Sequence, residues 1–345
     1  MNSKKNVTLK DLAIALDLSV SVVSRVLSGK AREYRISEDT EKAVRAEAKR
    51  RGFSVNHLAR SLRLKKTRTV GLLIPDISNG FFSAIAQSVE STARKRDYSV
   101  ILCDTEGNEE IERSSLEYLC GRTVDGFLVA PVGLNSDHII AIAGKSIPLV
   151  LLDRFFPDTG LPYVTSDNFQ GAYEGARYLL ENGHRSIGFI QGIPECQTSI
   201  ERLKGYQMAL MQFDVPFKQS LVSGVDFAEQ RGYDSTLALL KRKPRPTALF
   251  ASSAVGALGA MRACAESKLR IPHDISLVGF DDYPYAALLS PPLTTIAQKS
   301  EAIGRIACDL VLDWLENGKR PEEGGVVLKT SLVPRASVRE ITPET

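Results

Sequence analysis

The sequence has few residues that build covalent or metal-based frameworks, and it has no long apolar run. Its five cysteines lie at positions 103, 120, 196, 264 and 308 without a Cys-x-x-Cys pair, and its four histidines form no cluster. We therefore expect no disulfide framework, no metal site and no cofactor. No apolar stretch reaches the roughly 18 residues of a membrane span, and the amino-terminal segment has no apolar signal core. The sequence predicts a cytoplasmic protein without a membrane partner.

Positive charge is concentrated at one end of the chain. The net charge of all 345 residues is only +3, but residues 1–68 hold 17 Lys and Arg against 7 Asp and Glu. The rest of the chain holds 27 basic and 34 acidic residues. A basic head on an acidic body is typical of nucleic-acid binding, because phosphate contacts supply most non-specific affinity. The alternative is a solvated basic tail, but a tail would lack the apolar helices described next.

Three short helices are predicted in this basic head. Thr8 begins the first, "TLKDLAIAL", with Asp11 completing a capping box. Ser19 and Ser37 are the amino-terminal caps of the second and third helices. Only Asp17 and Leu18 separate the first two helices, and this spacing predicts a helix-turn-helix whose second helix enters a DNA major groove.

The second helix of the pair, in "DLSVSVVSRVLSG", has two distinct faces. At helical spacing, Val23, Val26 and Leu27 share the face that we expect to be buried. The opposite face is small and polar and carries one cation; its residues are Val20, Ser21, Ser24 and Arg25. Taken alone, this outward face suits a solvated surface as well as it suits a DNA-reading surface.

The segment "SVNHLARSLRLKKTRT" at residues 54–69 connects the head to the body. Asn56 can cap a helix of about two turns that ends at Leu62 or Arg63, and a helix this short is marginal alone in water. Its five cations suggest that DNA stabilises it. The alternative is a basic linker.

From residue 69, apolar stretches of strand length alternate with helical stretches. One series runs from "TVGLLIPDI" to "IPLVLLD", and a second runs from "YVTSD" to "ISLVGFDD". This alternation predicts α/β architecture with two doubly wound parallel-sheet lobes, each covered by helices on both faces. Several strands end in polar residues, which we expect to converge on a cleft between the lobes, since ligands bind at the carboxyl ends of such strands.

The sequence resembles the lactose/galactose-repressor (LacI/GalR) family of bacterial transcription regulators from Val7 to about Val338. The most specific matches are "VTLKDLAIALDLSVSVVSRVLSG", "NHLARSLR", "TRTVGLLIPDISNGFF", "VDGFLVAP", "ERLKGYQMAL", "ALGAMRA", "VGFDD" and "PPLTTIAQ". The resemblance implies a helix-turn-helix domain at 1–55, a hinge at 56–68 and an effector-binding body of the periplasmic-binding-protein type at 69–345. In that body, one lobe would comprise 69–165 plus 295–325, and the other 166–294 plus 326–340.

The resemblance also implies partners and DNA-binding residues. Family members are homodimers, or tetramers built from dimers, on pseudo-palindromic double-stranded operators. The base-reading positions match Val20, Ser21 and Arg25, and an arginine there suits guanine O6 and N7. Phosphate-positioning residues match Thr8, Ser19, Ser24 and Ser37. The hinge carries Asn56, His57, Ala59 and Leu62, and Leu62 matches a leucine that enters the minor groove.

For the cleft, the resemblance implies a small sugar or sugar-phosphate effector. The matching positions are Phe81, Phe82, Asp153, Thr198, Arg202, Phe227, Ser253, Asp281 and Gln298. Aromatic faces, carboxylates, an amide and one arginine together suit a sugar. Each residue also has a purely structural interpretation: the phenylalanines Phe82 and Phe227 as core residues, and Asp281 as a helix cap.

Two departures from the family pattern bear on specificity. Ser253 and Ala254 stand where most members have Asn-Asp, so the cleft lacks one carboxylate. The loop "SGKAREYRIS" is about three residues longer than usual. Fructose and sucrose repressors share both features, which favours a fructose-type or phosphorylated ligand over a neutral hexose. Asp17 replaces the usual turn glycine, and aspartate tolerates left-handed angles better than most residues.

Three classes of function are open at this point. The pattern favours a regulator, and in particular a repressor of carbohydrate-utilisation genes, over an activator. A sugar-binding module without DNA function predicts a signal peptide and no basic head. An enzyme is disfavoured, because no phosphate loop, GxSxG turn or metal spacing is present.

Overall fold

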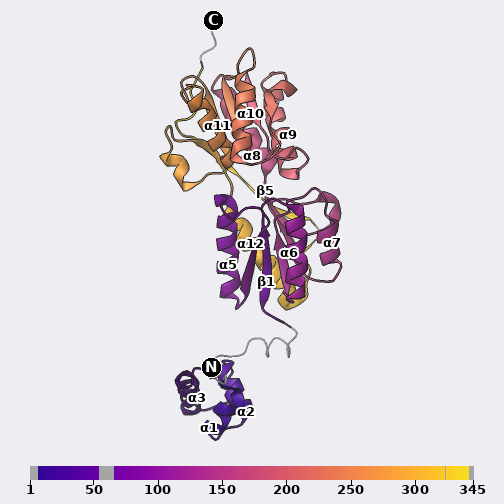
Figure 1. Ribbon diagram of the computed structural model, residues 1–345, viewed down its shortest axis with the longest axis vertical. Helices are drawn as coiled ribbons and strands as arrows, with labels where there is room; N and C mark the ends of the chain where they lie inside the picture. Colours follow the sequence, from indigo (N-terminus) through magenta and orange to yellow (C-terminus); the bar gives the residue numbers. More distant parts are fainter. Residues whose placement is uncertain (1–6, 54–65, 323, 342–345) are drawn as a thin grey trace, which may run out of the picture. The chain divides into compact units, whose positions relative to one another are not determined.

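The computed structural model describes residues 7–53, 66–322 and 324–341, which belong to two compact units divided after Thr67. The first unit is a helical head and the second is an α/β body (Figure 1). The predicted hinge positions Asn56, His57, Ala59 and Leu62 lie outside the described residues.

The head contains the three predicted helices: α1 (Leu9–Ala15), α2 (Val20–Leu27) and α3 (Glu38–Arg50). The capping box of α1 is formed, because the Asp11 N–H donates to Thr8 Oγ1 and the Thr8 N–H donates to Asp11 Oδ2. Ser19 and Ser37 accept backbone N–H groups in the first turns of α2 and α3. All three predicted caps are therefore confirmed.

The turn between α1 and α2 depends on a left-handed residue. Asp17 has φ 51°, which is the left-handed angle that we expected of the residue standing in place of the usual turn glycine. The Leu18 N–H closes the turn on the carbonyl of Ala13 at 3.0 Å. All three helices contribute completely buried residues to the head's apolar core: Leu12, Val23, Val26 and Val44.

The body contains two six-stranded sheets among the described residues. The first has the order β11-β5-β4-β3-β1-β2 and is parallel throughout. Its strands are β1 (Thr69–Ile74), β2 (Ser99–Asp104), β3 (Gly126–Val129), β4 (Leu149–Leu152), β5 (Tyr163–Ser166) and β11 (Gly325–Leu328). The second has the order β12-β10-β9-β8-β6-β7, and only β12 is antiparallel. Its strands are β6 (Ile187–Ile190), β7 (Val222–Ser223), β8 (Ala248–Ala251), β9 (Ser276–Phe280), β10 (Thr294–Ala297) and β12 (Ser331–Val333).

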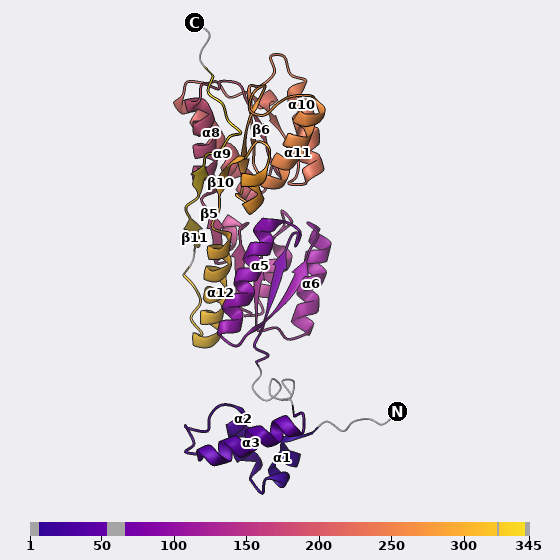
Figure 2. The same ribbon diagram turned by 90° about the vertical axis from the view of Figure 1, so that its left-hand side faces the viewer.

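Helices cover both sheets, as predicted for doubly wound lobes (Figures 1 and 2). Lobe one carries α5 (Gly80–Lys95), α6 (Glu109–Gly121), α7 (Asp137–Ala143) and α12 (Ser300–Asn317). Lobe two carries α8 (Asn168–Glu181), α9 (Gln197–Gln212), α10 (Glu229–Leu240) and α11 (Ala254–Glu266). Short 3-10 turns lie at η1 (Pro157–Thr159), η2 (Gln219–Leu221) and η3 (Pro284–Leu288). Helix α12 packs beside α5, although more than 200 residues separate them in sequence.

The chain passes between the lobes three times in the described body, after β5, β10 and β11. The family resemblance implied that the last two boundaries lie at about 294/295 and 325/326. Instead, β10 lies wholly in the second sheet and β11 wholly in the first. Strand β5, which opened the second series in the sequence, pairs with β4 in the first sheet. Apolar stretches mark strands, but the sheet that each strand joins depends on long-range pairing.

Among the described residues, no helix combines the length and the apolarity needed to cross a bilayer.

Candidate functional site

The outward face of α2 is accessible, as the sequence predicted. Val20 is 45% exposed, Ser21 and Arg25 are exposed, and Ser24 is half-buried. Ser19 accepts the Val22 N–H at 3.3 Å, which leaves its own hydroxyl hydrogen free to donate. Thr8 differs, because its hydroxyl already lies 2.7 Å from Asp11 Oδ2. The head therefore presents small side chains and one guanidinium on a surface that can approach DNA closely.

Three of the predicted cleft residues, Asp153, Asp281 and Gln298, lie near a buried arginine in lobe two. Arg202, on the first turns of α9, is only 4% exposed. Its Nε donates to Asn168 Oδ1 at 2.8 Å, and its Nη1 donates to the carbonyl of Ser252 at 2.5 Å. The guanidinium carbon lies 3.8 Å from the centroid of the Phe280 ring. These contacts hold the side chain in one orientation.

Two carboxylates flank this arginine from opposite lobes. Asp153 follows β4 in lobe one, and Asp281 follows β9 in lobe two; both are buried and have left-handed backbones, with φ 59° and 77°. Burial raises the pKa of Asp153 to about 6, although the nearby positive charges of Arg202 and Arg154 oppose that shift. Burial likewise raises the pKa of Asp281 and lowers the pKa of Arg202. We call Asp153, Arg202 and Asp281 the cleft triad.

Several buried polar atoms near the triad have no hydrogen-bond partner within the described protein. They are Asp153 Oδ1, Arg154 Nε, Ser166 Oγ and Gln298 Oε1, and all four follow or end strands at the carboxyl edges of the two sheets. Gln298 uses its amide nitrogen on Asp281. Buried polar groups are normally paired, so this cluster is suited to a polar ligand.

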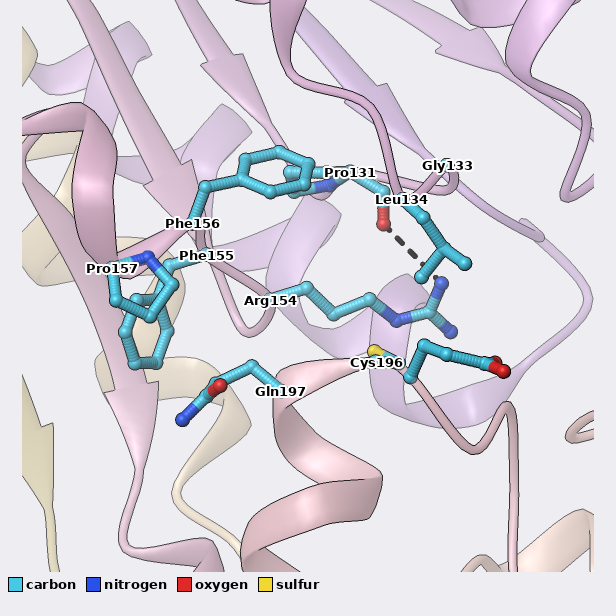
Figure 3. A pocket seen from close by; sticks show the side chains of 10 residues that line it. Pro131, Gly133, Leu134, Arg154, Phe155, Phe156, Pro157, Cys196 and Gln197 are labelled. Carbon is cyan, nitrogen blue, oxygen red and sulfur yellow. Dashed lines mark hydrogen bonds between the residues drawn. The ribbon is translucent and has the colours of Figure 1, made fainter.

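A pocket of about 220 Å³ opens beside the triad (Figure 3). Lobe one contributes residues that follow β3 and β4, and lobe two contributes the segment before α9; the lining is Pro131, Gly133, Leu134, Arg154, Phe155, Phe156, Pro157, Glu195, Cys196 and Gln197. Arg154 spans the pocket, and its Nη1 donates to the carbonyl of Pro131 at 3.2 Å. None of the predicted effector residues lines this pocket, but Arg154 directly follows the triad's Asp153.

The other predicted effector residues have mixed environments. Phe81 and Phe82, on α5, are buried in an apolar cluster that also includes Ala254 and Tyr283 from lobe two. This supports the structural interpretation of Phe82 as a core residue. Ser253 caps α11 by accepting the Gly256 N–H at 3.0 Å.

Thr198 and Phe227 lie on the lobe-two side of the cleft. Thr198 is 1% exposed, and its hydroxyl lies 3.4 Å from the thiol of Cys196. The ring of Phe227 is half-buried, with its centroid 5.1 Å from the guanidinium carbon of Arg154. Asp281 accepts a backbone hydrogen bond from Ala254 at the start of α11, as the helix-cap interpretation requires, and it also contacts Gln298 and lies near Arg202 of the same lobe.

Sequence reasoning missed three polar residues of this site: Arg154, Ser166 and Asn168. Each stands at the carboxyl end of a predicted strand. The available signal was the polar run that ends each strand. Tyr283 was also missed; its hydroxyl donates to Asn79 Oδ1 at 2.6 Å and so links the two lobes.

The fold and the site together define a ligand-responsive DNA-binding regulator, with a helix-turn-helix head and a two-lobed binding body. Residues 176–338 match the periplasmic binding protein-like domain. The chain is 34% identical over 339 residues to the transcriptional repressor PurR of Pectobacterium carotovorum subsp. carotovorum, which covers 96% of this chain and 97% of that protein. The lac repressor dimer bound to operator is 26% identical with TM-score 0.85, covering 97% of this chain and 100% of its own. The CelR–cellobiose complex is 29% identical with TM-score 0.73, covering 96% and 100%. The chain belongs to the LacI/GalR family of bacterial transcriptional regulators.

Proposed function

We propose that this protein represses carbohydrate-utilisation genes by binding a pseudo-palindromic operator as a homodimer. The exposed face of α2 supports operator reading, with Arg25 donating to guanine and Ser19 and Ser24 donating to phosphate. A two-fold symmetric dimer presents two such faces to a two-fold symmetric site. The proposal places the protein with chromosomal DNA in the cytoplasm, and it assigns no catalytic step to the chain.

The observation that carries the effector proposal is the buried triad with its unpartnered neighbours. Burying three charged groups destabilises the folded body, and buried charged groups with shifted pKa values cluster at functional sites. A small polyhydroxylated molecule offers donors to Asp153 Oδ1 and Gln298 Oε1 and acceptors to Ser166. The triad is closed from solvent. Entry of the effector therefore requires the two lobes to move apart by bending at the three chain segments that connect them. The cellobiose bound by the related CelR supports a sugar as the ligand class.

Within that class we propose a fructose-type sugar or sugar phosphate. Arg154 places a second guanidinium beside the triad; its Nε lies 4.0 Å from Asp153 Oδ2 and has no hydrogen-bond partner within the described protein. Ala254 adds no carboxylate to the cleft. Arg154 and Arg202 balance the carboxylates of Asp153 and Asp281, and no third acid stands at position 254. The site therefore tolerates an anionic group better than a site with that third acid would, because like charges repel strongly where water is excluded. A neutral hexose or disaccharide held by Asp153 and Asp281 is the alternative.

The operator proposal is tested by selecting binding sites from random DNA and measuring affinities by gel shift. Arg25→Ala should cost about 1–3 kcal/mol at one base pair in each half-site and relax specificity there. Equal weakening on every sequence would place Arg25 on phosphate instead.

The effector proposal is tested by thermal shift with fructose, fructose phosphates, glucose and galactose. Ligand at 100 times its dissociation constant should stabilise the body by about 2.7 kcal/mol. Arg154→Gln should abolish the response to the phosphorylated ligands while leaving operator binding intact. A response to glucose or galactose alone would refute the fructose-type assignment.

A further inference from the structure

The long loop between α2 and α3 is folded against the head. It leaves α2 through the left-handed Gly29, and the Lys30 N–H donates to the carbonyl of Arg25 at 2.9 Å. Ala31 is 2% exposed in the apolar core of the head, and Ile36 packs against that core. The Ile36 N–H donates to the carbonyl of Ala31 at 2.9 Å. With both ends anchored, the turn between them has a defined position.

This turn brings an aromatic ring to the predicted base-reading residue. The guanidinium carbon of Arg25 lies 3.9 Å from the centroid of the Tyr34 ring, well within the range of a cation–π contact. Tyr34 is 44% exposed, so the pair stands at the surface of the head. The ring occupies the face of the guanidinium, whereas hydrogen bonds to guanine use its edge. Within the described head, no carboxylate or carbonyl oxygen accepts a hydrogen from that edge.

We propose that Tyr34 is a positioning residue for operator recognition. A free arginine side chain loses rotamer freedom when it binds a base. The stack against Tyr34 restricts Arg25 before DNA arrives, so less entropy is lost when it donates to guanine. The longer loop thus contributes to specificity without itself touching a base. This inference rests on the proposed reading of the operator by α2.

A direct phosphate contact is the competing role for Tyr34. Its hydroxyl is a donor, and the neighbouring cations Lys30, Arg32 and Arg35 make the loop attractive to a DNA backbone. The two roles use different parts of the side chain. Positioning needs the ring, and a phosphate contact needs the hydroxyl.

The test measures full-length variants on the selected wild-type operator and on its single-base-pair variants. Tyr34→Ala should weaken operator binding roughly three- to thirtyfold and reduce discrimination at the same base pair as Arg25→Ala. Tyr34→Phe should behave as wild type, and Tyr34→Leu, which keeps apolar bulk without a π face, should behave as Tyr34→Ala. In an Arg25→Ala background, Tyr34→Ala should add no further loss.

The matched control is Glu33→Ala, which lies in the same loop and pairs only with the exposed Lys30 at 3.6 Å. It should leave base preference unchanged. Loss in Tyr34→Phe, uniform weakening on all sequences, or additive losses in the double variant would each overturn the inference. A wild-type protein that selects no sequence would instead refute the proposed function. Circular dichroism checks that each head is folded.

Discussion

Asp153→Asn should stabilise the body at neutral pH while impairing the proposed effector site. Burial raises the pKa of Asp153 from its usual 3.8 to about 6, even with Arg202 and Arg154 nearby. That difference corresponds to about 3 kcal/mol of free energy that the folded body loses when Asp153 ionises. Asparagine keeps the shape of the side chain and removes the charge.

The sign of the pH dependence follows from the raised pKa. Because the folded body holds this proton more tightly than the unfolded chain, the penalty is complete above about pH 7. It shrinks as the pH falls through 6 and approaches zero only below about pH 3, where Asp153 is protonated in both states. The difference in stability between Asp153→Asn and wild type should therefore be largest at pH 8 and fall to a small fraction of that value by pH 4.

Thermal or urea unfolding of the wild type and the variant across pH 4–8 provides the measurement. Asp97→Asn is the matched control, because Asp97 has the same φ of 59° but its side chain is 92% exposed. It should not alter the dependence of stability on pH. If Asp153→Asn is no more stable than wild type at pH 8, the carboxylate is not carrying a desolvation penalty and the argument for a strained polar site fails.

Three further substitutions test other parts of the body. Arg202→Ala should destabilise the body by about 3–5 kcal/mol at pH 8, because it removes the cation nearest to buried Asp281 and leaves buried Asp153 with Arg154 alone; urea unfolding should show a smaller loss at pH 5, and an equal loss at both pH values would count against this. Ala254→Asp should lower the free energy of unfolding by at least about 2 kcal/mol at pH 8, because it places a charge in the apolar cluster that includes Tyr283. Ala254→Asn adds a similar volume without the charge, so equal losses of stability in the two variants would assign the cost to volume. Gly205→Ala should cost about 1–3 kcal/mol, because its Cβ would lie 2.2 Å from a backbone oxygen of α8. Gly121→Ala, in open space, should be neutral or stabilising by up to about 1 kcal/mol, and matching losses at the two glycines would contradict the packing argument.

The parts of the fold that depend on local interactions could be predicted from the sequence. Thr8 and Asp11 are three residues apart, so a capping box needs no distant partner. Asp17 takes the left-handed angle because the turn between two helices allows little else. The strands follow from apolar stretches for the same reason, whereas the sheet joined by β10 depends on pairing with β9.

The site could be predicted only in outline. The positions of Asp153, Arg202 and Asp281 followed from a family pattern, but the approach of Asp153 to Arg202 depends on how the two lobes close. Ser253 fitted both a cap and a ligand from sequence, and only the bond to the Gly256 N–H shows the cap. The stack of Tyr34 on Arg25 joins residues nine apart through a loop whose course no sequence pattern specifies.

The late position of α12 and β11 in the chain has a consequence for the order of biosynthesis. The described core of the head is complete by Phe53, whereas lobe one lacks a covering helix until Asn317 and an edge strand until Leu328. On a ribosome, the operator-binding part of a nascent chain can therefore fold long before either wall of the cleft is finished. A chain whose synthesis stops within its last sixth would have a folded head but an incomplete effector-binding body.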